Sequence, residues 1–143
     1  MSNKIRVLFL CVHNSARSQL AEGLLRAMAG DRIEVFSAGS EPSFVHPLAL
    51  QVLYERGIDA SQHRSKSVQE FASAKFDYVI TLCAEEVCPI FLGATQKLHW
   101  ALADPAAAHP EKQLTAFRLA ANELENCLQY FIEKEIHAHS RNQ

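Results

Sequence analysis

The sequence predicts an α/β protein, a three-layer open sandwich whose four-stranded parallel sheet carries helices on both faces. Two observations lead to this fold class. Along the 143 residues, β-favouring runs and helical segments follow the order strand, helix, strand, helix, strand, strand, helix, which is typical of an open sheet with right-handed crossovers. The first run, residues 5–12 (IRVLFLCV), is apolar without polar alternation, as expected for a central strand buried on both faces.

The first half of the chain supplies two strands and two helices. After the first strand, apolar residues recur at helical spacing from Ser15 to Gly30, which predicts a helix that ends at this glycine. Residues 32–39 (RIEVFSAG) predict the second strand. Residues 46–57 (HPLALQVLYERG) predict a second helix that ends at its closing glycine.

The second half of the chain adds two strands and a long helix. Residues 67–71 (SVQEF) predict a short helix, and residues 77–82 (DYVITL) predict a third strand with Cys83 at its carboxyl end. Residues 95–102 (TQKLHWAL) form a weaker pattern for the fourth strand. From residue 114 to residue 132 apolar residues recur every three or four positions, which predicts an amphipathic helix.

The composition and charge fit one globular domain over residues 1–143, with a flexible tail from about residue 137. A net charge of -2 without a Lys/Arg block argues against a nucleic-acid surface. The N-terminal apolar run is too short for a signal peptide or a membrane span, so we expect a cytoplasmic protein with no membrane contact. We also expect a monomer. In a reducing cytosol, the four cysteines are expected to be catalytic, redox-active or buried. The seven histidines show no ligand spacing, so no metal site is expected.

Residues that can carry chemistry gather at the ends of the predicted strands. Cys11, Ser37, Cys83 and Asp104 each fall at or just after such an end. In an open α/β sheet the carboxyl ends of the strands meet at one edge, where ligands bind. The sequence therefore predicts the active site at this edge.

The loop after the first strand has the spacing C-x5-R, from Cys11 to Arg17. Its backbone N–H groups can turn inward and, together with the amino end of the next helix, form a bowl for an anion. Arg17 adds a planar set of donors for two oxygens of a tetrahedral oxyanion. The same positive field favours a thiolate, so Cys11 is the candidate nucleophile. The candidate oxyanion-binding residues are Val12, His13, Asn14, Ser15, Ala16 and Arg17.

Two neighbouring residues fit this site. Ser18 can donate its hydroxyl to the Cys11 sulfur, and Asn14 suits a left-handed backbone position that turns the loop inward. The alternative for Cys11 is a buried core cysteine, which is common in apolar strands. The full context of strand, C-x5-R-S and amphipathic helix favours the nucleophile. Cys127, between apolar positions of the last helix, is expected to be a core or half-buried thiol.

The stretch LFLCVHNSARSQLAEGLLR resembles the phosphate-binding loop of the low-molecular-weight protein tyrosine phosphatase family, and ALADP resembles its later Asp-Pro loop. The similarity runs from Ile5 to about Phe131 and implies the flavodoxin-like topology of that family. Within the family, the segments NSARSQLAEG, SAGS and FDYVITLC are more similar to the arsenate reductases than to the phosphatases. The resemblance implies an enzyme that converts arsenate to arsenite in arsenic detoxification.

Both branches of the family share a first step. The Cys11 thiolate attacks the central atom of the oxyanion, and protonated Asp104 gives its proton to the leaving oxygen. The alternative function is therefore a phosphatase that hydrolyses phosphomonoesters, including phosphotyrosine, through a Cys11 phosphoenzyme. Family phosphatases usually carry aromatic residues directly after the Asp-Pro, whereas residues 106–108 are alanines here, which favours a small inorganic anion. A third hypothesis, a non-catalytic oxyanion-binding module, does not explain why Cys11, Arg17, Ser18 and Asp104 occur together.

The resemblance also implies how a reductase would move two electrons. Cys83 attacks the sulfur of the Cys11–arsenate adduct, arsenite leaves, and a Cys11–Cys83 disulfide forms. Cys88 then attacks Cys83 and leaves a Cys83–Cys88 disulfide for an external reductant, thioredoxin or glutaredoxin, so no bound cofactor is expected. One alternative is that a small thiol with glutaredoxin or mycoredoxin resolves Cys83 or Cys11 without Cys88. The other alternative for Cys88 is a buried cysteine beside Pro89.

Some reductases of this family bind a potassium ion near the loop through an asparagine, a glutamate, a serine and an aspartate. Asn14, Glu22 and Ser37 match three of these residue types. At the fourth position the stretch HRSKS offers Lys66 or its neighbours and no carboxylate. We therefore predict no metal.

Overall fold

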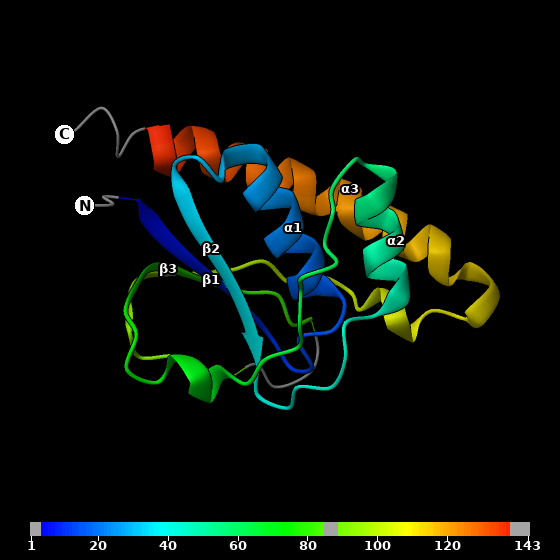
Figure 1. The fold of residues 1–143 in the computed structure, drawn as a ribbon, viewed down its shortest axis with the longest axis horizontal. Coiled ribbons are helices and arrows are strands. Elements are labelled where there is room, and N and C mark those ends of the chain that lie inside the picture. Colours follow the sequence, from blue (N-terminus) through cyan, green and yellow to red (C-terminus); the bar gives the residue numbers. More distant parts are fainter. Residues whose placement is uncertain (1–3, 85–88, 138–143) are drawn as a thin grey trace.

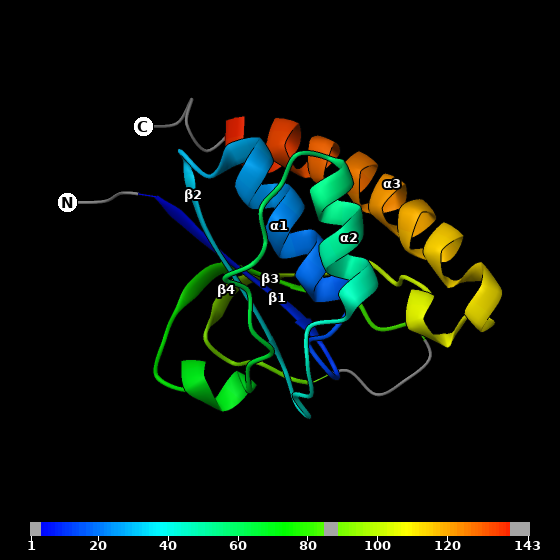
Figure 2. The ribbon, with the colours of Figure 1, turned by 45° about the vertical axis from the view of Figure 1, so that its right-hand side comes forward.

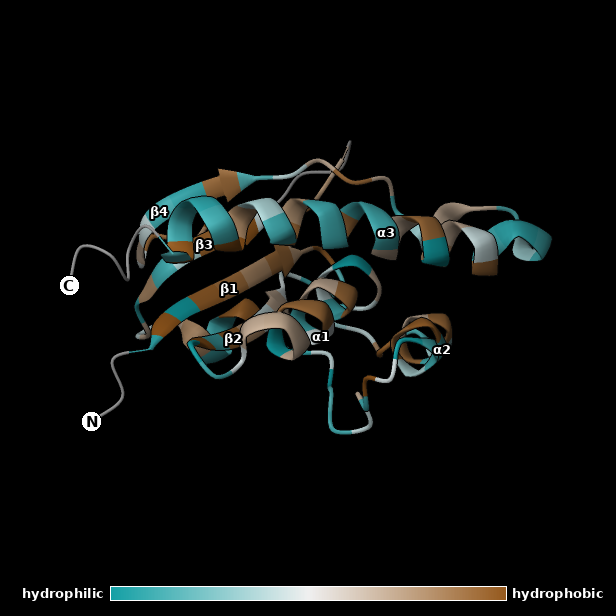
Figure 3. Cartoon of the chain, turned by 90° about the horizontal axis from the view of Figure 1, so that it is seen from above, coloured by the Kyte–Doolittle hydropathy of each residue, from teal (hydrophilic) through white to brown (hydrophobic). Residues whose placement is uncertain are grey.

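The structure is a computed structural model that describes residues 4–84 and 89–137. In this part of the chain, four strands form one parallel sheet in the order β2-β1-β3-β4. Their bounds are β1 (Ile5–Cys11), β2 (Ile33–Gly39), β3 (Phe76–Thr81) and β4 (Ala94–His99). Figure 1 labels β1, β2 and β3 of this sheet, and Figure 3 shows all four strands side by side. The predicted parallel sheet is confirmed, and each strand lies within a few residues of its expected range.

Strand β1 is buried on both faces because it lies between β2 and β3. Val7 and Phe9 point into the core on one face, and Leu8 and Leu10 point into the core on the other. All four side chains are fully buried. Strand β4 lies at the edge of the sheet and is mostly exposed. The strength of each sequence pattern therefore follows the burial of its strand.

The α-helices of the described residues cover one face of the sheet. Helices α1 (Arg17–Ala29), α2 (Pro47–Glu55) and α3 (Gln113–Phe131) contact one another, and Figure 2 shows them together on one side. Residues from all three helices join the odd-numbered side chains of β1 in one core. This layer explains why each predicted helix has one apolar face.

The opposite face of the sheet is covered differently. Within the described ranges it carries the 3₁₀ helix η1 (Val68–Phe71) and no α-helix. Aromatic rings pack there edge to face with centroid separations from 5.4 to 5.7 Å, and they belong to Phe36, Phe71, Phe76 and Phe91. The second helical layer of the predicted sandwich is thus one short 3₁₀ helix, because large aromatic side chains cover the apolar area instead.

The long C-terminal helix of the prediction is confirmed as α3. Its buried residues recur at helical spacing, and they include Phe117, Leu124, Leu128 and Phe131. A π-helical turn (Ile132–Ile136) continues the chain. Figure 3 shows β1 in largely apolar colours and β4 in largely polar ones. Across the described ranges, the structure contains no helix with the length and apolar character that a membrane crossing requires.

The carboxyl ends of the strands bring the predicted site residues to one edge of the sheet. Cys11 is the last residue of β1 and pairs in register with Gly39, the last residue of β2. Cys83 follows the end of β3, and Asp104 lies beyond β4. The arrowhead of β2 marks this edge in Figure 1.

Candidate active site

The loop of residues 12–16 connects β1 to α1 and is held through its carbonyl oxygens from outside. The backbone N–H of Glu41 donates to the carbonyl of Val12 at 2.8 Å. The backbone N–H of His46 donates to the carbonyl of Ser15 at 3.0 Å. These two contacts occupy carbonyl oxygens of the loop with donors from the segment before α2. A loop of this kind can bind an oxyanion where its N–H groups face inward.

Gly39 allows β2 to approach this loop closely. A Cβ atom at position 39 would lie 2.4 Å from the carbonyl oxygen of Val12 and 2.8 Å from the amide nitrogen of Asn14. The N–H of Gly39 also donates to the carbonyl of Lys66 at 2.9 Å. A side chain at this position would displace the loop, so the glycine is required by the close approach.

Asn14 turns the loop inward. Its φ of 49° lies in the left-handed region, where asparagine is tolerated better than most residues. Its buried Nδ2 donates to the Oγ atoms of Ser18 (2.8 Å) and Ser37 (2.9 Å). Its Oδ1 accepts the backbone N–H of Lys66 at 2.8 Å, and its carbonyl accepts from Gln19 Nε2 at 2.9 Å. The predicted left-handed conformation of Asn14 is confirmed.

Cys11 lies at the base of the loop as a free, buried cysteine. Its Sγ lies 2.8 Å from the Oγ of Ser18, which is the contact expected from the sequence. In the described part of the chain, no side chain caps the first N–H groups of α1, and its first turn contains no acidic residue. The positive end of α1 is therefore available to an anion held by the loop.

The guanidinium of Arg17 is oriented by backbone carbonyls. Its Nη1 donates to the carbonyl of Leu102 at 3.1 Å and to that of Leu82 at 3.5 Å. Its Nη2 lies 3.9 Å from Oδ2 of Asp104. The side chain is almost fully buried, yet it lines the same cavity as Cys11. Segments that follow β3 and β4 thus fix the arginine beside the bowl.

Asp104 is held at the start of the 3₁₀ helix η2 (Pro105–Ala107). Its Oδ1 accepts the backbone N–H of Ala106 at 3.0 Å. The side chain is 31% exposed and lines the cavity. Its carboxyl group can therefore exchange a proton with a molecule bound over Cys11.

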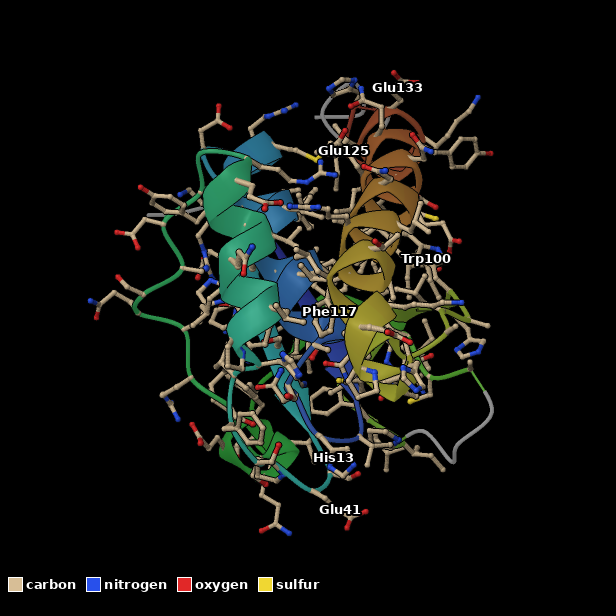
Figure 4. The ribbon with its side chains drawn as sticks, turned by 90° about the vertical axis from the view of Figure 1, so that its right-hand side faces the viewer. His13, Glu41, Trp100, Phe117, Glu125 and Glu133 are labelled. Carbon is tan, nitrogen blue, oxygen red and sulfur yellow. The ribbon has the colours of Figure 1, made fainter. Side chains whose placement is uncertain are left out.

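The cavity over Cys11 has a volume of about 250 Å³. Its other lining residues come from the loop, from the segment before α2 and from the Asp104 turn: His13, Ser15, Ala16, Arg17, Ser43, Phe44, His46, Asp104 and Ala106. The His13 side chain is exposed, and its Nδ1 forms a hydrogen bond with the carbonyl of Glu41 at 3.1 Å. Figure 4 shows these two residues together at one end of the molecule. Of the predicted loop residues, Val12 and Asn14 do not line this cavity, and Val12 packs with Cys11 and Cys83.

Two aromatic residues of the cavity are absent from the sequence prediction. Phe44 is 60% exposed at the cavity. His46 begins α2, where its Nδ1 accepts the N–H of Leu48 at 3.1 Å, and its ring centroid lies 4.6 Å from that of Phe117. Burial lowers the pKa of His46, although the charge of Asp104 opposes this shift. Because Nδ1 accepts a hydrogen bond, the proton of the neutral ring is on Nε2.

Family phosphatases usually carry aromatic residues directly after the Asp-Pro, and here Phe44 and His46 bring aromatic rings to the cavity from another segment. The expectation that the alanines at 106–108 leave the site without aromatic residues is therefore wrong. The signal available in the sequence was a histidine directly before Pro47 at a helix start. That signal indicates a helix cap and does not indicate which cavity the residue faces.

The two cysteines predicted to exchange electrons lie together. Cys83 is buried and packs with Cys11 and Val12 in one small cluster. Cys88 lies outside the described residues. Cys127 is half-buried in α3. Burial raises the pKa of its thiol, and the negative charge of Glu123 raises it further.

Glu22 forms the centre of a buried polar cluster next to the loop. Its Oε1 accepts the Ser37 hydroxyl, and its Oε2 accepts Arg26 Nη2 at 2.7 Å. Nζ of Lys66 lies 3.7 Å from Oε1, so an ammonium group stands at the fourth position of the potassium pattern. Within residues 4–84 and 89–137, no cluster of three or more His, Cys, Asp or Glu side chains is placed to hold a metal ion.

The family model for low molecular weight phosphotyrosine protein phosphatases matches residues 6–142. The chain belongs to this family. Among curated members, an arsenate reductase of Halalkalibacterium halodurans is 38% identical over 135 residues, which are 92% of this chain and 97% of that protein. The family expected from the loop motif is therefore confirmed.

Solved structures of this phosphatase family agree with the fold. One is an arsenate reductase in the phosphate binding state, with a TM-score of 0.77, 33% identity and coverage of 91% of this chain and 98% of that chain. A second is a thioredoxin-dependent arsenate reductase of Corynebacterium glutamicum, with a TM-score of 0.65 and 36% identity. The match to it covers 91% of this chain and 65% of that chain.

Proposed function

We propose that this protein is an arsenate reductase in which Cys11 is the nucleophile and Cys83 is the second redox cysteine. The observation that carries the proposal is the buried packing of these two cysteines, from the ends of different strands, beside a loop that can hold an oxyanion. A phosphatase of this fold requires only the first cysteine. The similarity to an arsenate reductase over 92% of the chain supports the same activity.

The first step forms a covalent adduct on the nucleophile. The N–H groups of residues 12–16 and the Arg17 guanidinium hold arsenate while the Cys11 thiolate attacks arsenic(V). A sulfur–arsenic bond forms and an arsenic–oxygen bond breaks. Protonated Asp104 gives its proton to the departing hydroxyl, which leaves as water. The short contact between Ser18 Oγ and Cys11 Sγ supports a hydroxyl that stabilises the thiolate.

The second step reduces the arsenic. The thiolate of reduced Cys83 attacks the sulfur of Cys11, so a sulfur–sulfur bond forms while the sulfur–arsenic bond breaks. The electron pair of the broken bond stays on arsenic, which leaves as arsenic(III) in arsenite. The two cysteine thiols thus supply two electrons and end as a disulfide.

The disulfide must be reduced before the next turnover. We propose that Cys88 attacks Cys83, releases Cys11, and leaves a disulfide between Cys83 and Cys88 that a thioredoxin-class protein reduces. The thioredoxin-dependent relative of Corynebacterium glutamicum supports this electron donor. A relay of this kind needs a reducing compartment, which the cytoplasm provides.

A phosphomonoester hydrolase is the second candidate function. The rings of Phe44 and His46 line the cavity and can flank an aryl group bound to a phosphate. This function shares the first step, but water then hydrolyses the phosphoenzyme and Cys83 takes no part. The two candidates therefore differ in what they require of Cys83.

The deciding experiment measures arsenite release and arsenate-dependent NADPH oxidation with the thioredoxin and glutaredoxin systems in parallel. We expect turnover by the wild type with thioredoxin, and none by Cys83→Ser, which still binds inorganic phosphate. Cys127→Ser is the matched control, because this half-buried cysteine of α3 lies outside the cavity, and it is expected to turn over normally. Arsenite release by Cys83→Ser, or p-nitrophenyl phosphate hydrolysis as the main activity, would refute the proposal.

A further inference from the structure

A buried path of hydrogen bonds connects Glu22 of α1 with the nucleophile. Oε1 of Glu22 accepts the Ser37 hydroxyl, and the Ser37 Oγ accepts Nδ2 of Asn14 at 2.9 Å. The same Nδ2 donates to the Ser18 Oγ at 2.8 Å, and this oxygen lies 2.8 Å from Sγ of Cys11. All five side chains are buried, so bulk water does not replace these bonds.

The chemistry of the groups determines the direction of each bond in this path. The Nδ2 of Asn14 only donates, so Ser18 and Ser37 both use an oxygen lone pair to accept its hydrogens. The hydroxyl hydrogen of Ser37 is therefore directed to the Glu22 carboxylate, which only accepts. The Cys11 sulfur as a thiolate can only accept, so the hydroxyl hydrogen of Ser18 is directed to it. The path ends with a hydrogen presented to the nucleophile.

Lys66 secures this path at two points. Its backbone N–H donates to Oδ1 of Asn14 at 2.8 Å, which prevents the amide from rotating by half a turn. Its ammonium lies 3.7 Å from Oε1 of Glu22 and donates to the carbonyl of Arg64 at 2.9 Å. Arg26 binds the other carboxylate oxygen at 2.7 Å. One residue thus orients the amide and supplies positive charge to the carboxylate oxygen that Ser37 uses.

We propose that Glu22 and Lys66 are positioning residues of the nucleophile, because their ion pair maintains a carboxylate that keeps the Ser18 hydroxyl directed at the Cys11 sulfur. The inference rests on Cys11 being the nucleophile of the proposed function and does not depend on arsenate being the substrate. Glu22 and Lys66 are not among the residues that line the described cavity. They act only through the residues between them and the sulfur.

The groups around Glu22 keep its side chain ionised, as the carboxylate that accepts the Ser37 hydroxyl. Burial opposes its ionisation, but Lys66, Ser37, His63 and Arg26 together bring the pKa of Glu22 below its ordinary value. His63 Nε2 lies 3.8 Å from Oε2, and burial lowers the pKa of His63, although the charge of Glu22 opposes this shift. Glu22 is consequently a carboxylate at neutral pH.

The test follows the reactivity of Cys11 and is independent of turnover. The reduced full-length protein is alkylated with iodoacetamide over a series of pH values, and mass spectrometry quantifies the peptide that contains Cys11. The variants are Glu22→Gln, Ser37→Ala, their combination, and Lys66→Met. Glu70→Gln is the matched control, because it breaks an exposed ion pair with Arg64 in the neighbouring segment.

At slightly acidic pH, Glu22→Gln and Ser37→Ala are each expected to slow Cys11 alkylation about tenfold, the scale of one lost hydrogen bond to a charged group. The double variant is expected to be no slower than either single variant, because both changes interrupt the same path. Lys66→Met is expected to slow alkylation by a smaller factor, because Arg26 remains. The control is expected to react at the wild-type rate.

Unfolding temperatures are measured on the same samples, because a purely structural role would lower stability without changing the alkylation profile of the folded protein. Wild-type alkylation in Glu22→Gln or Lys66→Met, or additive slowing in the double variant, would overturn the proposal. If Glu22→Gln does not fold, Ser37→Ala tests the same path with the ion pair intact. If the alkylation pattern holds but arsenate is not reduced, the proposed function is wrong and the positioning role stands.

Discussion

Substitutions at Asn14 separate the two contributions that this residue makes to the loop. Glycine adopts the φ of 49° without cost, whereas a left-handed conformation costs alanine about 1–2 kcal/mol. Both replacements remove three buried hydrogen bonds, from Nδ2 to two serine hydroxyls and from the Lys66 N–H to Oδ1, at 2.8–2.9 Å. At about 1 kcal/mol each, these bonds contribute about 3 kcal/mol to the free energy of unfolding.

We therefore expect Asn14→Gly to lose about 3 kcal/mol and Asn14→Ala to lose about 4–5 kcal/mol. For a chain of this size, at about 3 °C per kcal/mol, the melting temperature falls by roughly 10 °C and by roughly 13 °C. Scanning calorimetry measures these values, and titration with inorganic phosphate shows whether the bowl still binds an anion. We expect weaker phosphate binding in both variants.

The control for these variants is Asn126→Ala on the exposed side of α3, which is expected to change stability by about 0.5 kcal/mol or less. If Asn14→Ala is at least as stable as Asn14→Gly, the left-handed conformation at position 14 does not destabilise alanine relative to glycine, and the prediction is wrong. If both variants remain within about 1 kcal/mol of the wild type, the buried hydrogen bonds contribute less than the geometry indicates.

Three further predictions follow from contacts in or near the site. Gly39→Ala is expected to lower the free energy of unfolding by about 2 kcal/mol and to weaken phosphate binding, because its Cβ would lie 2.4 Å from a loop carbonyl. The control is Gly57→Ala, at a position with a φ of 78° and open space around it. Calorimetry is expected to show a loss of stability in this control without a loss of phosphate affinity. Burial lowers the pKa of His63, so the unfolded chain binds more protons than the folded one and stability falls as the pH drops below about 6.5. Urea unfolding at several pH values gives the free energy of unfolding as a function of pH. This free energy is expected to change less steeply with pH in His63→Gln than in the wild type, and equally steeply in the exposed His109→Gln. The same steepness in the wild type and both variants would contradict this. Phe44→Ala is expected to raise the KM for p-nitrophenyl phosphate about 2- to 10-fold while the inhibition constant of inorganic phosphate stays unchanged, because only the aryl group loses a contact.

The predicted features that the structure reproduces are those with a local cause. The apolar run of β1 predicts a central strand buried on both faces, and Val7 to Leu10 are fully buried. The three- and four-residue spacing of apolar residues in α3 predicts a helix with one buried face. Asn14 adopts the left-handed conformation because its short polar side chain tolerates it. In each case the physical cause of the feature lies in residues that are close together in the chain.

The features that could not be predicted depend on which distant segments meet. The covering of the second sheet face by aromatic rings requires Phe36 and Phe91 to lie in one layer, and no local pattern states this. The cavity wall of Phe44 and His46 arises because the segment before α2 crosses the loop and donates to its carbonyl groups. From the sequence alone, neither a histidine that caps a helix nor an exposed phenylalanine indicates which cavity it lines.

The amino-acid sequence by itself determined the parallel sheet, the C-x5-R loop and the candidate roles of Cys11, Arg17 and Asp104, because local periodicity and loop chemistry specify these. Only the tertiary structure decided that Cys83 packs against Cys11, and that Glu22 and Lys66 reach the sulfur through three polar side chains. Those contacts join residues far apart in the chain. Their energies come from packing and from hydrogen bonds that exist only after the crossovers have brought the strand ends to one edge.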